Sequence, residues 1–163
     1  MNVILTGQRQ IGKSTALGRF LAGFSGSVAG FRTVFDSRSD PKNRRLLLCA
    51  IPDGESETAV IWTDGTPQVE LAVFDRCVPS MLAQNADLFV LDELGKFEGG
   101  AAEMQRAVEA LFDAAADVLA VVRCDAPGWM GALKARPDVT VLTVTEKNRD
   151  GVPAVLAKLL HRV

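Results

Sequence analysis

One eight-residue segment combines two glycines, a lysine and a serine at a spacing that is typical of an anion-binding loop. It reads Gly7-Gln8-Arg9-Gln10-Ile11-Gly12-Lys13-Ser14 and fills every fixed position of the pattern G-x-x-x-x-G-K-[ST]. The glycines allow backbone angles at which consecutive N–H groups point at one anion, and a helix starting near Lys13 adds the positive end of its dipole. Lys13 can reach the β- and γ-phosphates of a nucleotide, and Ser14 can offer its hydroxyl to Mg²⁺. We therefore predict that this phosphate loop (P-loop), with Thr15 after it, binds a nucleoside triphosphate and Mg²⁺.

Two carboxylates, Asp92 and Glu93, follow a run of four apolar residues at positions 88–91. Such a run indicates a strand buried on both faces, and parallel sheets bind ligands at the carboxyl ends of their strands. Asp92 is predicted to hold Mg²⁺, usually through its waters, because a hard cation prefers oxygen ligands. Glu93 is suited to orient or deprotonate an attacking water, which favours hydrolysis over transfer to an alcohol. A pair of solvated acids at a strand end is the alternative interpretation. Consecutive strand residues point to opposite sides, so the two carboxylates need not share a role.

The elements that must position these residues alternate between strands and helices. We expect strands at residues 1–6, 27–33, 88–91, 118–122 and 139–144, and helices at 13–22, 74–84, 101–116, 128–134 and 151–161. This alternation predicts an α/β domain of three layers, in which a mostly parallel sheet lies between helices. A length of 163 residues suits a single domain over residues 1–163.

The middle of the chain follows a different pattern. Residues 46–51, 58–62 and 69–71 are short β-prone pieces separated by turn residues, and residues 36–45 are a polar loop with a proline. We interpret residues 46–71 as a small antiparallel β insertion within the α/β domain.

Composition disfavours several classes of function. The net charge is −2, so the chain lacks the basic field of a nucleic-acid binder, and the basic residues 42–45 fit a solvated loop better. Three widely spaced cysteines, Cys49, Cys77 and Cys124, argue against structural zinc or a disulfide framework and favour a reduced, cytoplasmic location. No apolar run is long enough to span a membrane, and no signal peptide is indicated. Oligomerisation leaves no clear signature, and we expect a monomer.

Four stretches match one family in the same order along the chain. They are Leu5-Thr6 with the phosphate loop; Gly30-Phe31-Arg32-Thr33, like G-F-x-T; Asp92-Glu93-Leu94-Gly95-Lys96-Phe97-Glu98, close to D-E-I-G-K-M-E; and residues 138–145 followed by Asn148-Arg149-Asp150, like V-T-x-x-N-R-[DN]. The chain thus resembles the THEP1-type nucleoside-triphosphatases, also called cancer-related NTPases. The first stretch is shared by many families, whereas the last two together are fairly specific.

The resemblance implies slow, Mg²⁺-dependent hydrolysis of several nucleoside triphosphates to the diphosphate and phosphate. It also implies a RecA-like core in which strand 118–122 lies between the phosphate-loop strand and the Asp-Glu strand. Arg123 would then end near the γ-phosphate, as a charge sensor or a group that stabilises the transition state. A surface arginine after a strand is the alternative.

Asn148 and Arg149 follow a strand end at which a base can sit. Gly151 occupies the last position of what would be the guanine-reading pattern N-K-x-D, so we expect weak discrimination between bases. A helix cap by Asn148 or Asp150 is the alternative. Lys96 can pair with a nearby acid or reach a phosphate, and the structural pair is slightly favoured.

The departures from the family lie between residues 33 and 71, which are compressed relative to its usual insert. The chain has no tyrosine, so the aromatic residue of the family's V-G-x-Y-x-V strand is lost. Phe31 and Trp62 can stack on a base or simply pack in the core.

Two other functions remain open. A small-molecule or nucleotide kinase would need an acceptor pocket and an arginine-rich lid, for which residues 38–45, with Arg38, Lys42, Arg44 and Arg45, are the candidate. A nucleotide-dependent switch or adaptor would use the same phosphate loop and present the β insertion to a partner. The Asp92-Glu93 pair argues mildly against the switch.

Overall fold

The sheet that positions the site contains eight strands within residues 1–36, 40–52, 54–125 and 127–160, the part of the chain that the computed structural model describes. The strands are β1 Asn2–Thr6, β2 Val28–Phe35, β3 Arg45–Ile51, β4 Ser56–Thr63, β5 Thr66–Val69, β6 Leu88–Leu94, β7 Asp117–Val122 and β8 Val139–Thr143. Their order across the sheet is β5-β4-β3-β2-β6-β7-β1-β8.

One part of this sheet is parallel and the other antiparallel. β2, β6, β7, β1 and β8 run parallel, whereas β3, β4 and β5 continue from β2 as an antiparallel meander. β1 is buried along its whole length, as a strand between two layers of helices must be. The mostly parallel sheet and its antiparallel insertion confirm the expected fold class. β7 lies between β6 and β1, as the family resemblance implied.

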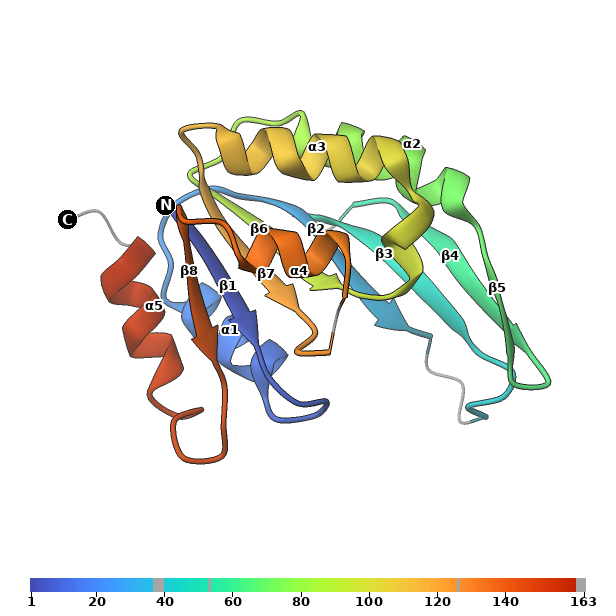
Figure 1. Ribbon diagram of the computed structural model, residues 1–163, viewed down its shortest axis with the longest axis horizontal. Coiled ribbons are helices and arrows are strands. Elements are labelled where there is room, and N and C mark those ends of the chain that lie inside the picture. Colours follow the sequence, from blue (N-terminus) through green and yellow to red (C-terminus); the bar gives the residue numbers. More distant parts are fainter. Residues whose placement is uncertain (37–39, 53, 126, 161–163) are drawn as a thin grey trace.

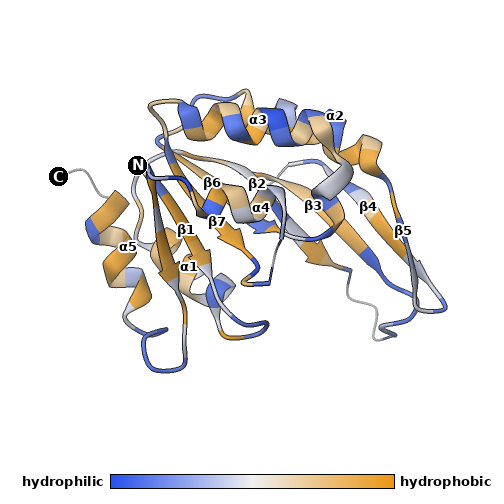
Figure 2. Cartoon of the chain, in the orientation of Figure 1, coloured by the Kyte–Doolittle hydropathy of each residue, from blue (hydrophilic) through white to orange (hydrophobic). Residues whose placement is uncertain are grey.

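Helices cover both faces of the sheet (Figure 1). They are α1 Lys13–Ala22, α2 Leu71–Leu82, α3 Ala102–Asp113, α4 Trp129–Lys134 and α5 Val152–Leu160, with a short 3₁₀ helix at Phe97–Gly100. Side chains alternate along β1, so that Ile4 packs with α2, α3 and α4 while Val3 and Leu5 pack with α1 and α5. Figure 2 shows mainly apolar residues along β1 and β7, whereas α3 carries a mixture of apolar and polar residues. No helix within the described residues is long and apolar enough to cross a membrane.

The insertion differs from the sequence-based expectation in its last strand. Asp64 and Gly65 have φ angles of 49° and 82°, which make a two-residue hairpin turn. Thr66 and Pro67 therefore pair with β4 instead of completing a longer turn. The sheet tolerates Pro67 because β5 is an edge strand, where a missing N–H costs no ladder bond. Leu71, expected in this strand, begins α2 instead.

β2 is also longer than expected and ends at Phe35 rather than Thr33. The extension exists because β3 pairs with it as far as Phe35 and Leu46, which are partners in the ladder. The hairpin is closed by Asp36, whose carboxylate accepts a hydrogen bond from the Arg45 N–H at 3.0 Å. The remaining elements differ from expectation only at their ends, and His161 lies outside the described residues.

Candidate nucleotide-binding and catalytic site

The phosphate loop connects β1 to α1 and needs glycine at both of its fixed glycine positions. Gly7 has φ 146°, and a Cβ there would lie 2.6 Å from the carbonyl oxygen of Val144. Gly12 has φ 109°, a left-handed conformation that other residues rarely adopt. Any larger residue at position 7 would push the loop away from the turn that follows β8.

Lys13 lies over the loop that it follows. Its side chain is almost fully buried, and its Nζ donates hydrogen bonds to the carbonyl oxygens of Gly7 at 3.0 Å and Gln8 at 2.8 Å. α1, which begins at Lys13, has no acidic residue in its first turn. The helix N–H groups and the ammonium therefore present positive charge that no carboxylate of that turn offsets.

Asp92, at the carboxyl end of β6, meets the start of α1. The Ser14 hydroxyl lies near its carboxylate, and both side chains line the same cleft. Burial and, next, the neighbouring charge of Glu93 raise the pKa of Asp92 to about 6, although the Ser14 hydroxyl and the positive charges of Lys13 and Arg32 oppose the rise. The two residues predicted to bind Mg²⁺ thus lie close together across the two elements.

Glu93 shares this cleft with Asp92. The ladder between β6 and β7 shifts register between Asp92 and Leu94, and both carboxylates line the same cavity, although strict alternation would separate them. The peptide bond between the two residues is cis. Thr33 Oγ1 accepts a hydrogen bond of 3.4 Å from the Glu93 N–H, so the last residue of the Gly30–Thr33 stretch supports the acidic strand end.

The donor set at this point fits Mg²⁺. The described residues hold no group of three or more His, Cys, Asp or Glu side chains able to bind a metal by themselves. Mg²⁺ commonly takes one or two carboxylates and fills its remaining positions with waters and substrate phosphates. Ser14 and Asp92, both hard oxygen donors, match that preference.

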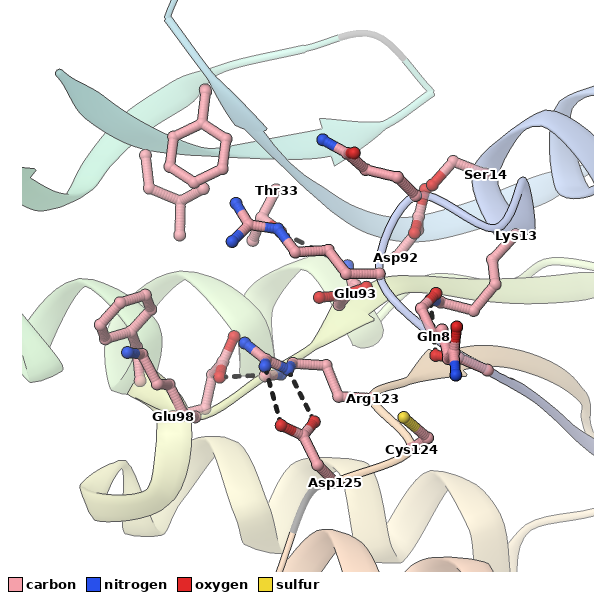
Figure 3. A pocket seen from close by; sticks show the side chains of 18 of the residues that line it. Gln8, Lys13, Ser14, Thr33, Asp92, Glu93, Glu98, Arg123, Cys124 and Asp125 are labelled. Carbon is pink, nitrogen blue, oxygen red and sulfur yellow. Dashed lines mark hydrogen bonds and ion pairs between the residues drawn. The ribbon is translucent and has the colours of Figure 1, made fainter. Parts of the chain in front are cut away.

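A cleft of about 630 Å³ joins the phosphate loop to the β insertion (Figure 3). Its lining includes Asp92, Glu93 and Arg123, and most of the predicted loop residues: Gly7, Gln8, Arg9, Gln10, Gly12, Lys13, Ser14 and Thr15. Ile11 is the exception, because its side chain packs against the core between the sheet, α1 and α5. The cleft extends beyond Glu93 to residues of β2, β3 and β4.

Arg123 follows β7 and lines the cleft, as the family resemblance implied. Its Nε and a terminal nitrogen donate to the two carboxylate oxygens of Asp125, at 3.1 and 3.0 Å. Figure 3 shows this forked pair at the cleft wall, with Glu98 and Glu93 nearby. The guanidinium is therefore held at the cavity by a residue two positions along the chain.

Glu98 is a cleft residue to which the sequence patterns assigned no role. It is only 2% exposed, and its Oε2 accepts a hydrogen bond of 3.0 Å from the Gly95 N–H. Burial raises its pKa to about 7. The available signal was its place as the last residue of the Asp92–Glu98 match, but that match alone did not indicate that the carboxyl is buried.

Asn148 does not line the cleft. Its side-chain nitrogen donates to the Thr143 carbonyl at 2.9 Å, and its side-chain oxygen accepts from the Thr145 N–H at 2.8 Å. Both amide groups thus stabilise the turn after β8, which is a structural role but not the helix cap that was the expected alternative. Arg149 lies beside the phosphate loop, since a Cβ at Gly12 would be 3.7 Å from the Arg149 Cδ.

The structure bears on the hypotheses about Phe31, Trp62 and Lys96. Phe31 is fully buried in the core, so its proposed stacking on a base is wrong. Trp62 lines the cleft. Lys96 has no acidic partner among the described residues, and its Nζ lies 5.0 Å from the Phe97 ring centre.

Among the described basic residues of the candidate arginine-rich lid, one lines the cleft. Arg44 lines the cleft, whereas Arg45 pairs with Asp36 at 3.4 Å and Lys42 does not reach the cavity. Arg38 lies outside the described residues.

Comparison with known proteins points to one family. A family model described as NTPase matches residues 2–157. The nucleoside-triphosphatase THEP1 of Natranaerobius thermophilus is 29% identical over 170 residues, which cover 98% of this chain and 96% of that protein. The protein of the same name from Thermotoga maritima is 28% identical, over 93% of this chain and 91% of that protein.

Two solved structures share the fold. The crystal structure of THEP1 from the hyperthermophile Aquifex aeolicus superimposes with a TM-score of 0.81 at 19% identity, covering 99% of this chain and 100% of that one. The solution structure of a human cancer-related nucleoside triphosphatase also gives a TM-score of 0.81, at 21% identity, covering 98% and 97%. The family model, the curated relatives and the shared fold confirm the resemblance, and the chain belongs to the THEP1-type NTPase family of P-loop proteins.

Proposed function

We propose that this chain hydrolyses nucleoside triphosphates, with Mg²⁺, to the diphosphate and phosphate. The observation that carries the proposal is that Ser14, Asp92 and Glu93 line one cleft with the phosphate loop. The cleft places a phosphate-binding loop beside a strand end that has one carboxylate for the metal and a second for water. Hydrolysis needs those two parts within one cleft.

The phosphate loop binds the triphosphate in this proposal. Its backbone N–H groups, from Gly7 to Thr15, surround the β-phosphate, and Lys13 moves from the loop carbonyls to the β- and γ-phosphate oxygens. Ser14 and Asp92 hold Mg²⁺. The metal, when bound, neutralises charge on the β- and γ-phosphates.

Glu93 acts on the attacking water. Its carboxylate accepts a proton as the water oxygen forms a bond to the γ-phosphorus, and the bond from that phosphorus to the β–γ bridging oxygen breaks. The bridging electron pair leaves with the nucleoside diphosphate. Arg123, already at the cleft wall, stabilises negative charge that develops on the γ-phosphate oxygens.

Discrimination between bases should be weak in this proposal. The Asn148 amide is hydrogen-bonded within the turn after β8, so Arg149, beside the phosphate loop, is the remaining candidate for a base contact. A guanidinium can stack on any base. The chain is therefore expected to accept ATP, GTP, CTP and UTP at similar rates.

A second candidate is phosphoryl transfer to a small acceptor. The observation that favours it is the extension of the cleft beyond Glu93, where a second molecule can reach the γ-phosphate side. An acceptor that raises diphosphate production without raising phosphate release would support transfer.

One experiment tests hydrolysis directly. Phosphate release is measured from ATP, GTP, CTP and UTP, each with Mg²⁺ or with a chelator, for the wild type and Lys13→Ala. We expect release from all four nucleotides that requires Mg²⁺ and Lys13. An absence of release without an acceptor would refute the proposal.

A further inference from the structure

The end of the cleft formed by the β insertion carries an aromatic and cationic cluster that hydrolysis does not use. It consists of Phe35, Arg44, Trp62, Lys96 and Phe97, all of which line the cavity. The Trp62 ring centre lies 5.6 Å from that of Phe35 and 5.4 Å from that of Phe97. The Phe35 and Phe97 rings are inclined to the Trp62 ring by 58° and 82°, so they pack around the indole, on which another planar ring can stack.

The Arg44 guanidinium lies over two of these rings. The centre of its guanidinium is 3.9 Å from the Phe35 ring centre and 5.1 Å from that of Trp62. Its Nε is buried and has no hydrogen-bond partner among the described residues. The main chain fixes this arrangement, since the Trp62 N–H donates to the Arg44 carbonyl at 2.9 Å.

The two cationic side chains of the cluster form no ion pair with a described residue, although Glu93 and Glu98 line the same cleft. Within the described ranges, no carboxylate pairs with Arg44 or Lys96, whereas the adjacent Arg45 is paired with Asp36. Two free cations beside three rings complement a molecule with a planar ring and an anionic group.

The position of the cluster distinguishes it from a site for the triphosphate's own base. β2 to β5 lie on the β6 side of the sheet, whereas β8, whose following turn brings Arg149 beside Gly12, is at the opposite edge. Asp92 and Glu93 mark the γ-phosphate, so a triphosphate on the loop extends its ribose and base away from the insertion. The cluster therefore faces the γ-phosphate from the far side.

We infer that this cluster is a second ligand subsite, which binds a nucleoside monophosphate while the phosphate loop holds a triphosphate. The base stacks on Trp62, beside Phe35 and Phe97, and Arg44 and Lys96 bind the monophosphate. A cavity of about 630 Å³ lies within the range of about 300–1,000 Å³ for small-molecule sites. The net charge of −2 favours a mononucleotide over a nucleic-acid chain. The inference depends on the proposed function only for the orientation of the triphosphate.

Trp62 supplies the signal for a binding experiment. The chain has two tryptophans, and Trp129, whose Nε1 donates to Glu109, does not line the cleft. In a Trp129→Phe background, AMP or GMP is titrated in the presence of Mg²⁺ and a saturating non-hydrolysable ATP analogue. We expect quenching of Trp62 emission, with affinity at least roughly tenfold weaker in Arg44→Gln.

Arg45→Gln is the matched control, because it removes the same charge from the neighbouring, paired position and should leave binding unchanged. If Trp129→Phe does not fold, Arg44→Gln and Arg45→Gln are made with both tryptophans present. Their affinity for the monophosphate is then measured by calorimetric titration instead of fluorescence. Binding that Arg44→Gln does not weaken would overturn the inference, as would binding that the ATP analogue abolishes. A 5′-phosphorylated oligonucleotide is tested as well. If it binds more than tenfold more tightly than GMP, and if this binding depends on Arg44, the subsite is one for nucleic acid and the inference is overturned. Phosphate release without a monophosphate tests the proposed function separately.

Discussion

Replacing Glu98 by glutamine should remove part of the pH dependence of the free energy of unfolding. Burial moves the pKa of this carboxyl from its ordinary value of 4.5 to about 7. At about 1.4 kcal/mol for each tenfold change in proton affinity, the rise corresponds to about 3 kcal/mol. Because the folded pKa is raised, the stabilisation is fully present below pH 4.5 and is lost as the pH rises through about 7. The glutamine side chain of Glu98→Gln cannot ionise, so the variant does not lose this stabilisation as the pH rises.

The assay is urea unfolding followed by far-UV circular dichroism between pH 4.5 and 8. The free energy of unfolding of Glu98→Gln, minus that of the wild type, should rise by about 3 kcal/mol across this range. The change with pH carries the test, because glutamine also alters the hydrogen bond from Gly95 by a constant amount. Glu103→Gln, at an exposed helix position paired with Arg106, is the control and should give a flat difference. If the difference for Glu98→Gln is also flat, or falls with pH, the pKa of Glu98 is not raised by burial in the folded state.

Three further predictions concern the catalytic cleft. Asp92 has a pKa of about 6, so lowering the pH from 7.5 to 5 should protonate it. The Mg²⁺ concentration needed for half-maximal phosphate release should then rise about tenfold. An unchanged Mg²⁺ requirement would contradict the assignment of Asp92 as a metal ligand. Gly7→Ala should abolish nucleotide binding in a filter or calorimetric assay, whereas Gly18→Ala, in a helix position with no atom within 4 Å of the new Cβ, should raise the free energy of unfolding by about 0.5–1 kcal/mol. Arg123→Ala should lower kcat for phosphate release at least about tenfold, whereas Asp125→Asn, which keeps the arginine, should not; equal losses in both would point to a structural role for the pair.

The chemistry of the phosphate end was readable from the sequence because each role demands a particular residue type. Gly7 and Gly12 are needed for backbone angles, and Lys13, Ser14 and Asp92 for charge and oxygen ligands. The alternating pattern of buried strands also placed these residues at one edge of a sheet. The geometry brings them together without further assumptions.

The insertion end was not readable in the same way, because it depends on pairing between strands that are distant in sequence. Phe35 joins the cleft only because β3 extends the β2 ladder beyond Thr33. Arg44 and Arg45 are adjacent and chemically alike, and only the fold decides that one lines the cavity while the other pairs with Asp36. Asn148 fitted either a base contact or a turn, and the geometry of its amide favours the turn.

Glu93 is the residue that activates the attacking water in the proposed mechanism. Single-turnover phosphate release from Mg-ATP is measured for the wild type and Glu93→Gln, together with the affinity of each for a non-hydrolysable ATP analogue. We expect binding to stay within a few-fold while release slows by about 10²-fold or more. Release at the wild-type rate by a variant that binds the analogue normally would rule out this role of Glu93.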